Sequence, residues 1–310
     1  MTRRIVVAGA VSLYMSVGVT EFPVRYASTS SPRWIATGVS GAAGHIAQIL
    51  RTLGDDVRLC TVLGRDLPGL GIAAELGRNG LLGPGIVEGA ESSVGVALVG
   101  PDGRRMGLPH LTPVNTVPYP VNLLAANAHG ADLLVLTNTK FVRELVEPAS
   151  RLGVPIAVDL HLVSDLDGEY NRPWLDAATV VFCSDERLPD PPEVWVRRLF
   201  ARYPRCRLAG VGLGARGALL ATREGTLVRV EAVTPRGVVN TTGAGDALFA
   251  TFLHFWCEAE DPVRALRLAV VHAGWKVGAP ASVTASLTLD ELSALDAAHT
   301  PNAVVGRWDS

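Results

Sequence analysis

The residues best suited to chemistry lie in one short segment, Asn240-Thr241-Thr242-Gly243-Ala244-Gly245-Asp246, which runs directly into the apolar stretch 247–253. Two glycines around a small residue let the backbone approach a ligand closely. A helix that begins here would direct its free N–H groups and the positive end of its dipole at an anion. Because the charge of Asp246 would oppose that anion, the aspartate is better explained as a base beside a phosphate in transfer. The alternative is a glycine turn that only caps a buried helix.

The elements that must position this segment follow from the hydrophobic pattern. Short apolar, β-branched runs alternate with longer stretches of helical period. The predicted strands lie at 4–8, 57–62, 133–136, 155–159, 179–183 and 208–211. The predicted helices lie at 42–53, 70–79, 121–128, 141–152, 192–201, 246–257, 262–277 and 290–297. Since the strands are apolar throughout, we expect an α/β fold with a mostly parallel sheet buried between helices.

Two stretches, 11–38 and 94–108, break this alternation. The second is typical of a hairpin, with Pro101-Asp102-Gly103 as its turn. A further hairpin is predicted from strands at 218–222 and 226–232 around Glu224-Gly225, just before the segment 240–246.

Composition limits the class of protein. The 310 residues are 48% apolar and 19% charged, which is enough for one large domain with a sizeable core. The net charge of −2 without a long basic run argues against a nucleic-acid partner or a polybasic membrane surface. We find no apolar stretch near the roughly 20 residues of a membrane span. The N-terminus is better explained as a first strand than as a signal peptide, and four scattered cysteines are expected to be reduced thiols, so we predict a cytoplasmic protein.

The segment 240–246 resembles the Asp-Thr-x-Gly-Ala-Gly-Asp signature of the PfkB, or ribokinase-like, carbohydrate kinases, with six of seven positions matching. The resemblance implies a single ribokinase-like domain over 1–310, with a small β-sheet lid formed by insertions at about 11–38 and 92–110. It also implies that Asp246 takes a proton from a substrate hydroxyl while ATP gives up its phosphoryl group. Gly243 would shape the turn, the N–H groups of Ala244 and Gly245 would stabilise the phosphoryl, and Thr241 would lie on the ATP side.

A second segment, Gly38-Val39-Ser40-Gly41-Ala42-Ala43-Gly44-His45, resembles the family's N-terminal substrate motif, with Ser40 in place of a Gly and His45 in place of an Asn. The resemblance makes Gly38, Ser40, Gly41 and His45 substrate-side residues; the alternative is close strand–helix packing by small residues. The early Asp that grips sugar hydroxyls in many relatives has no counterpart in 9–14. Ser12 and Tyr14 are the substrate candidates there, although a lone Tyr14 is also explained as ordinary core.

Magnesium and cation sites depart from the family pattern. Ser184-Asp185-Glu186-Arg187 aligns with the family's Asn-x-x-Glu element, so Ser184 is placed near the nucleotide and Asp185 or Glu186 near Mg²⁺. The acidic pair is equally well explained as a solvated loop. Asn240 replaces an Asp that is linked in the family to a monovalent cation, which argues against activation by K⁺.

The nucleotide side is less distinctive. Gly212, Gly214 and Gly217 belong to a segment that resembles the family's contact with the ATP phosphates and ribose. They also fit Gly-x-Gly-x-x-Gly, but a dinucleotide site is rejected because a hairpin rather than a helix follows. His272 lies where relatives flank adenine, and it is also explained as a structural histidine. The sequence carries no P-loop motif.

The function expected from the resemblance is therefore ATP-dependent phosphorylation of a hydroxymethyl-type alcohol on a sugar or sugar-like molecule. A nucleoside kinase and a catalytically silent ligand-binding relative stay open as alternatives, whereas a serine hydrolase built on Ser40 is set aside. Lid sheets in this family often pair, which implies a homodimer. We expect small-molecule substrates, with no nucleic-acid or membrane partner.

Overall fold

A ten-stranded sheet forms the middle layer of the computed structural model, which describes residues 2–280 and 286–308. Its strands are β1 (Arg4–Ala8), β4 (Asp56–Gly64), β5 (Ile86–Gly89), β8 (Leu133–Leu136), β9 (Ile156–Leu162), β10 (Val180–Ser184), β11 (Leu208–Gly212), β12 (Ala218–Thr222), β13 (Thr226–Val230) and β14 (Ala303–Arg307). The order is β14-β13-β12-β11-β10-β9-β8-β1-β4-β5. Pairing is parallel from β11 to β5 and antiparallel from β11 to β14.

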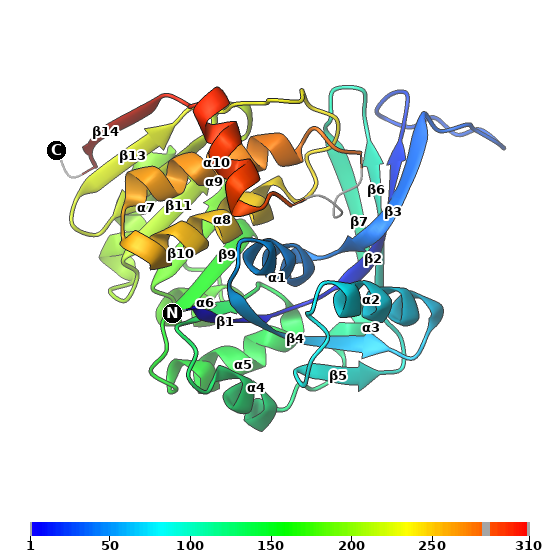
Figure 1. Cartoon of the computed structure of the whole chain (residues 1–310), viewed down its shortest axis with the longest axis horizontal. Coiled ribbons are helices and arrows are strands. Elements are labelled where there is room, and N and C mark those ends of the chain that lie inside the picture. The colour runs from blue at the N-terminus through cyan, green and yellow to red at the C-terminus, as the bar shows by residue number, and fades with distance from the viewer. Residues whose placement is uncertain (1, 281–285, 309–310) are drawn as a thin grey trace.

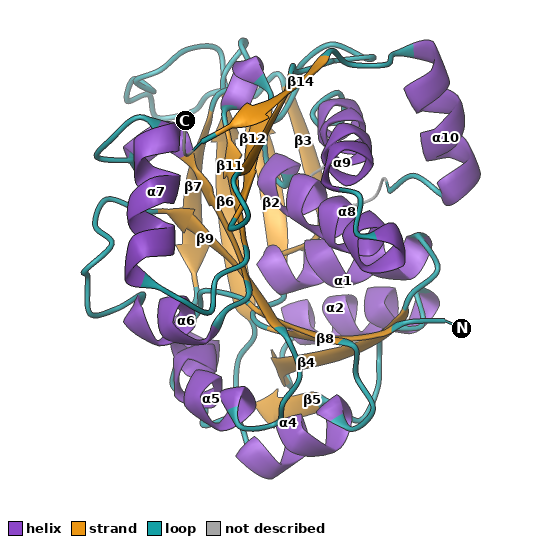
Figure 2. Cartoon of the chain, turned by 90° about the vertical axis from the view of Figure 1, so that its left-hand side faces the viewer, coloured by secondary structure: helices purple, strands orange, loops and turns teal. Residues whose placement is uncertain are grey.

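Helices cover both faces of this sheet (Figure 2). One layer consists of α1 (Ala42–Thr52), α2 (Leu67–Arg78), α8 (Ala244–Ala259), α9 (Pro262–Lys276) and α10 (Leu289–Ala298). The other consists of α3 (Thr112–Asn115), α4 (Val121–Ala128), α5 (Lys140–Ser150), α6 (Arg172–Ala177) and α7 (Pro192–Arg202). Successive side chains of a strand point to opposite faces, so Ile5 and Val7 of β1 lie in one core and Val6 and Ala8 in the other. This explains why the strands are apolar throughout.

A second sheet stands beside the first at the right of Figure 1 and forms the lid. It contains β2 (Ser12–Gly18), β3 (Trp34–Ser40), β6 (Ser93–Val99) and β7 (Arg105–His110), in the order β3-β2-β6-β7. Ser12, Tyr14 and Ser16 alternate with Leu13 and Met15 along β2, so the first three share one face. Ser16 Oγ lies 3.4 Å from Asn240 Nδ2, which identifies that face as the inner one, toward the segment 240–246.

The predicted architecture is confirmed. The expected central strands and helices are present with ends shifted by a few residues, and both predicted hairpins form, as β6–β7 and β12–β13. The sequence pattern missed the short elements β5, α3, α6 and β14. No helix in the described residues is long and apolar enough to cross a membrane. The four cysteines are free thiols.

Candidate active site

The site is built around the start of α8. Gly243 precedes the helix with φ 81°, in the left-handed region that favours glycine. A Cβ on Gly243 would also lie 3.0 Å from His45 Cε1. The first helical hydrogen bond runs from Ala247 N–H to Gly243 O over 2.9 Å. The Ala244 N–H turns back to Thr241 O at 3.3 Å, so the N–H groups of Gly245 and Asp246 are the ones that the first turn leaves for an anion.

Asp246 lies in this first turn with an unused acceptor. Its Oδ1 atom is buried and has no hydrogen-bond partner among the described residues. Burial raises the pKa of Asp246 to about 6; His161 opposes the shift and Asp159 adds to it. A carboxylate that titrates just below neutral pH is ionised at pH 7 yet still basic enough to accept a proton. This geometry would suit a general base beside an anion site, and that role of Asp246 stays a prediction.

Asp159 and His161, near the carboxyl end of β9, lie beside Asp246 and complete the site. One carboxylate oxygen of Asp159, one ring nitrogen of His161 and one carboxylate oxygen of Asp246 all lie within 4.8 Å of one another. Burial alone would lower the pKa of His161, but Asp159 and then Asp246 raise it to about 9. The ring is therefore an imidazolium at neutral pH, and we assign the three residues as an ion-pair cluster rather than a metal site.

Two further cations face this cluster from other elements. Lys276, in the last turn of α9, is 2% exposed, and burial lowers its pKa to about 8 against the opposing effect of Asp246. Arg105 begins β7, and its charge lowers the pKa of Asp246, as does that of Lys276. Sequence reasoning assigned none of Asp159, His161 and Lys276 to the site. For Asp159 and His161, the available signal was two polar residues near the carboxyl end of a strand that is otherwise apolar.

The predicted substrate loop lies directly under the glycine turn. Ser40 Oγ and His45 Nε2 are 3.0 Å apart, and both residues are buried. Burial, together with Lys276 and Arg105, holds the pKa of His45 well below its usual range, so the ring is neutral. Gly38 lies near the end of β3, and Gly41 precedes α1 with φ 88°. The structure thus brings the two sequence motifs into contact, through the His45 ring and Gly243.

The two candidates on β2 lie on the inner face of the lid. Ser12 is buried, with its Oγ 2.6 Å from Ser93 Oγ. Tyr14 pairs with Gly38 on one side and Gly95 on the other, and a Cβ on Gly95 would lie 2.3 Å from the ring. The glycines give the half-buried ring its space. A substrate role for either residue stays a prediction.

Asn240 and Thr241 join the signature to neighbouring segments. Asn240 Nδ2 donates to Pro280 O over 2.8 Å, and its Oδ1 accepts the Thr242 N–H over 2.9 Å. Thr241 Oγ1 donates to Gly103 O, in the β6–β7 turn of the lid, over 3.2 Å. The hydroxyl of Thr241 is thus bonded to the lid, while a contact with ATP stays a prediction. Thr242 Oγ1 is buried with no partner among the described residues.

Four of the predicted nucleotide residues, Ser184, Gly212, Gly214 and Gly217, lie at or just after the carboxyl ends of β10 and β11, the edge at which open α/β sheets bind ligands. Gly217 has φ 96°, and a Cβ there would lie 1.9 Å from Val230 O, so the turn that contains Gly214 and Gly217 requires glycine at 217. An ion pair between Asp185 and Arg216 links the two strand ends. Gly212 is the last residue of β11.

The acidic element after β10 forms a short 3₁₀ turn. Ser184 Oγ accepts the Glu186 N–H over 3.3 Å, and Glu186 is exposed. With Asp185 engaged by Arg216, the element offers few free carboxylate oxygens. Such a donor set fits a Mg²⁺ ion that is held mainly by phosphate and water oxygens, with Asp185 or Glu186 in support.

His272 is fully buried in α9. Its Nε2 accepts the Leu287 N–H over 3.2 Å, so Nδ1 carries the proton and donates to Thr251 Oγ1 over 2.7 Å. Both ring nitrogens are engaged, which favours the structural interpretation of this histidine over a contact with adenine.

Comparison with known proteins agrees with this geometry. The family described as pfkB family carbohydrate kinase matches residues 204–288, which include the start of α8. The acarbose 7(IV)-phosphotransferase of Actinoplanes sp. is 29% identical over 283 residues, covering 90% of this chain and 93% of that protein.

Solved structures match almost the whole chain. A microbiome-derived acarbose kinase superposes with a TM-score of 0.83 at 23% identity, covering 96% of this chain and 100% of the other. The ribokinase of Arabidopsis thaliana, solved with ribose and ATP, gives 0.78 at 19% identity, covering 95% and 99%. These structures share the fold. The family model matches residues 204–288 and the curated relative aligns along nine-tenths of the chain, so this protein is similar in sequence to the pfkB family carbohydrate kinases and shares the fold of the solved kinases.

Proposed function

We propose that this protein transfers the terminal phosphoryl group of ATP to a hydroxymethyl-type alcohol of a sugar or sugar-like molecule. The observation that carries the proposal is Asp246: a carboxylate with a buried, unpartnered oxygen at a helix N-terminus whose N–H groups are free for an anion. A binding protein has no need for a base in that position. The family and the named kinases that this chain resembles support the same reaction.

In this reaction, Asp246 removes the proton from the acceptor hydroxyl as the oxygen attacks the terminal phosphorus. The bond from that phosphorus to the bridging oxygen breaks, ADP leaves, and the proton stays on Asp246 until solvent removes it. The N–H groups of Gly245 and Asp246 stabilise the charge on the phosphoryl oxygens. The His45 ring fixes the position of the turn by packing against Gly243.

We propose Mg²⁺ as the cation that accompanies ATP and neutralises phosphate charge. We expect no requirement for K⁺. Asn240 Nδ2 donates directly to the Pro280 carbonyl, whereas a carboxylate in its place would need a bridging cation there.

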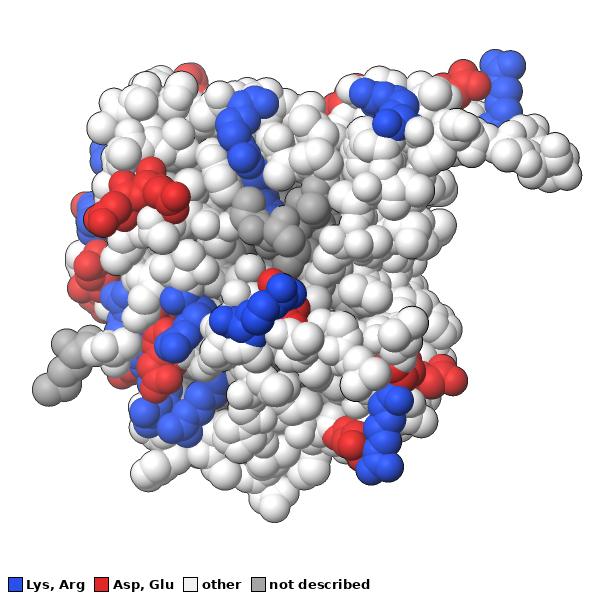
Figure 3. Space-filling model, turned by 45° about the vertical axis from the view of Figure 1, so that its right-hand side comes forward, with Lys and Arg blue, Asp and Glu red and all other residues white. Residues whose placement is uncertain are grey.

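The acceptor is proposed from the resemblance. The curated relative and one of the structural neighbours carry acarbose in their names, so acarbose is the first acceptor to test. This choice agrees with the lack of an acidic sugar clamp in 9–14. On the face shown in Figure 3, charges of both signs are interspersed, which suits a small-molecule substrate better than a polyanion.

The test is ADP release from MgATP in the presence of acarbose, simple sugars and nucleosides, with wild type and Asp246→Asn in parallel. Release that depends on one acceptor and disappears in the variant supports the proposal and identifies the substrate class. Turnover with nucleosides alone would make the protein a nucleoside kinase. ATP binding without turnover on any acceptor would contradict the proposal and favour a ligand-binding relative.

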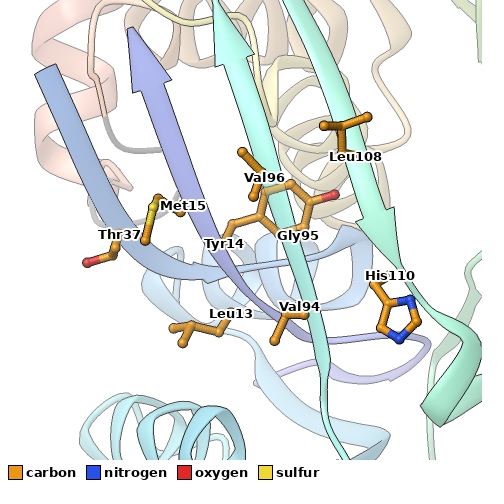
Figure 4. A pocket seen from close by; sticks show the side chains of 9 residues that line it. All are labelled: Leu13, Tyr14, Met15, Thr37, Val94, Gly95, Val96, Leu108 and His110. Atoms are coloured by element: carbon orange, nitrogen blue, oxygen red, sulfur yellow. The ribbon is translucent and has the colours of Figure 1, made fainter. Parts of the chain in front are cut away.

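We also propose that two copies of the chain pair through their lids in the cytoplasm. The outer face of the lid is apolar, with Met15 43% and Leu108 51% exposed, and it is hollowed by a pocket of about 370 Å³ whose lining Figure 4 shows. Exposed apolar area of this kind marks interaction surfaces. Light scattering should give a dimer for wild type and a monomer for Leu108→Lys; a wild-type monomer at assay concentration would contradict the pairing.

A further inference from the structure

His161 is held in an unfavourable backbone conformation at the end of β9. Its φ is 58°, in the left-handed region that residues other than glycine rarely adopt. Such backbone strain persists only where the surroundings impose it, and it concentrates at functional sites. Here the Asp159 carboxylate imposes it, because Asp159 Oδ1 accepts the His161 N–H over 2.8 Å.

The same carboxylate also orients the ring. Asp159 Oδ2 lies 3.4 Å from His161 Nδ1. Asp159 is buried, whereas the His161 side chain is 44% exposed and therefore lies at the open side of the cluster. One buried aspartate thus fixes both the backbone and the imidazole of a single histidine. This arrangement gives the ring a defined position.

That position is next to Asp246. The three side chains approach one another within 4.8 Å, and a Cβ on Gly245 would lie 3.7 Å from Asp159 Oδ2. Two carboxylates this close disfavour each other's ionisation. A cation in the same cluster offsets the repulsion, and the imidazolium of His161 is the cation placed there.

We infer that His161 is a positioning residue, held by Asp159 so that its imidazolium keeps Asp246 ionised and ready to accept the substrate proton. The inference rests on the proposed function for its consequence in catalysis, though not for the electrostatic coupling itself. Charged groups from three elements face Asp246: Asp159 and His161 on β9, Arg105 on β7 and Lys276 on α9. Of these, His161 has the largest lowering effect on the pKa of Asp246.

The test replaces His161 by Asn, which is neutral and tolerates the left-handed conformation better than most side chains. Carbon-13 NMR follows the Asp246 carboxyl through a pH titration of the ligand-free protein, with its resonance assigned by its loss in Asp246→Asn. We expect the midpoint, about 6 in wild type, to rise by about one pH unit or more in His161→Asn. The matched control is His129→Asn, at an exposed histidine in the C-cap of α4, which should leave the midpoint unchanged.

Kinetics give the second readout. In His161→Asn, the acidic limb of kcat/KM should move upward with the NMR midpoint, and the rate should recover above the limb. A role that is only structural would lower the rate at every pH without moving the limb. His161→Gly, which removes the side chain and relieves the backbone strain, provides a second variant if His161→Asn does not fold.

An unchanged Asp246 midpoint in a folded His161 variant would overturn the inference. Because the titration needs no turnover, it is separate from the proposed function. Wild-type kinase activity with an unmoved midpoint would refute the role of His161 alone. A shifted midpoint without kinase activity would refute the proposed function and leave the coupling intact.

Discussion

Replacing Asp246 by Asn should stabilise the folded protein while abolishing turnover. Burial, opposed by His161 and reinforced by Asp159, raises the pKa of Asp246 from 3.8 to about 6. The folded state therefore binds this proton more tightly than the unfolded state does. The protonated carboxyl of Asp246 therefore contributes to the stability of the folded state. This stabilisation is fully present below about pH 4 and is lost as the pH rises through 6.

The magnitude follows from that shift. Ionising Asp246 costs the folded state about 3 kcal/mol at pH 7 and about 1.6 kcal/mol at pH 5, calculated by linkage from the two pKa values. Asn is nearly isosteric and never ionises, so Asp246→Asn should gain up to these amounts. The gain should be about twice as large at pH 7 as at pH 5.

The assay is urea unfolding of wild type and Asp246→Asn at several pH values between 5 and 8. Asp66→Asn is a control with the opposite sign. Burial by itself would raise the pKa of Asp66. Hydrogen bonds from the N–H groups of Ser92 and Gly69 nevertheless hold this pKa below its usual value. Asp66→Asn should therefore lose stability, and lose most at neutral pH. A variant Asp246→Asn that is no more stable than wild type at pH 7, or a gain that does not change with pH, would refute the reasoning.

Three further predictions concern the same site. The kcat/KM of wild type should be half-maximal near pH 6 and fall about tenfold per pH unit below it, because Asp246 must be ionised; a flat profile from pH 5 to 8 would contradict this. Gly243→Ala should lower both the melting temperature and the activity, since φ is 81°, whereas the control Gly71→Ala, in open space on α2, should be neutral or stabilising in thermal unfolding. Wild-type activity should be equal in KCl and in choline chloride. Asn240→Asp should lose activity in choline chloride, because its carboxylate would face the Pro280 carbonyl without a cation between them. Equal activity of this variant in both salts would count against the argument.

The architecture could be predicted because it depends on local patterns. A parallel sheet that is buried on both faces favours unbroken apolar runs, which β8 has throughout and β1 has after Arg4, so both strands were predicted with their observed ends. The short strands β5 and β14 were missed because Ile86-Val87 and Ala303-Val304-Val305 are apolar runs too short to mark a strand. Their pairing is set by neighbouring strands rather than by their own sequence.

The site could be predicted only where one short segment carries the chemistry. The turn at Gly243 and the carboxylate of Asp246 are adjacent in sequence, so a joint role for them could be proposed from the sequence. His161 and Lys276 meet Asp246 only through the fold, across 85 and 30 residues of chain (161 to 246, 246 to 276). No spacing rule connects them. The contact of His45 with Gly243 likewise needed the structure, and it explains why two motifs about 200 residues apart belong to one site.

The central claim is that Asp246 is the base of a phosphoryl transfer. The most direct test is the rate of acceptor-dependent ADP release at pH 7.5 by wild type and Asp246→Asn, with ATP affinity measured for both. We predict equal ATP binding and a rate lower in the variant by on the order of 10²–10⁴-fold or more. A rate for Asp246→Asn within a few-fold of that of wild type would contradict the account.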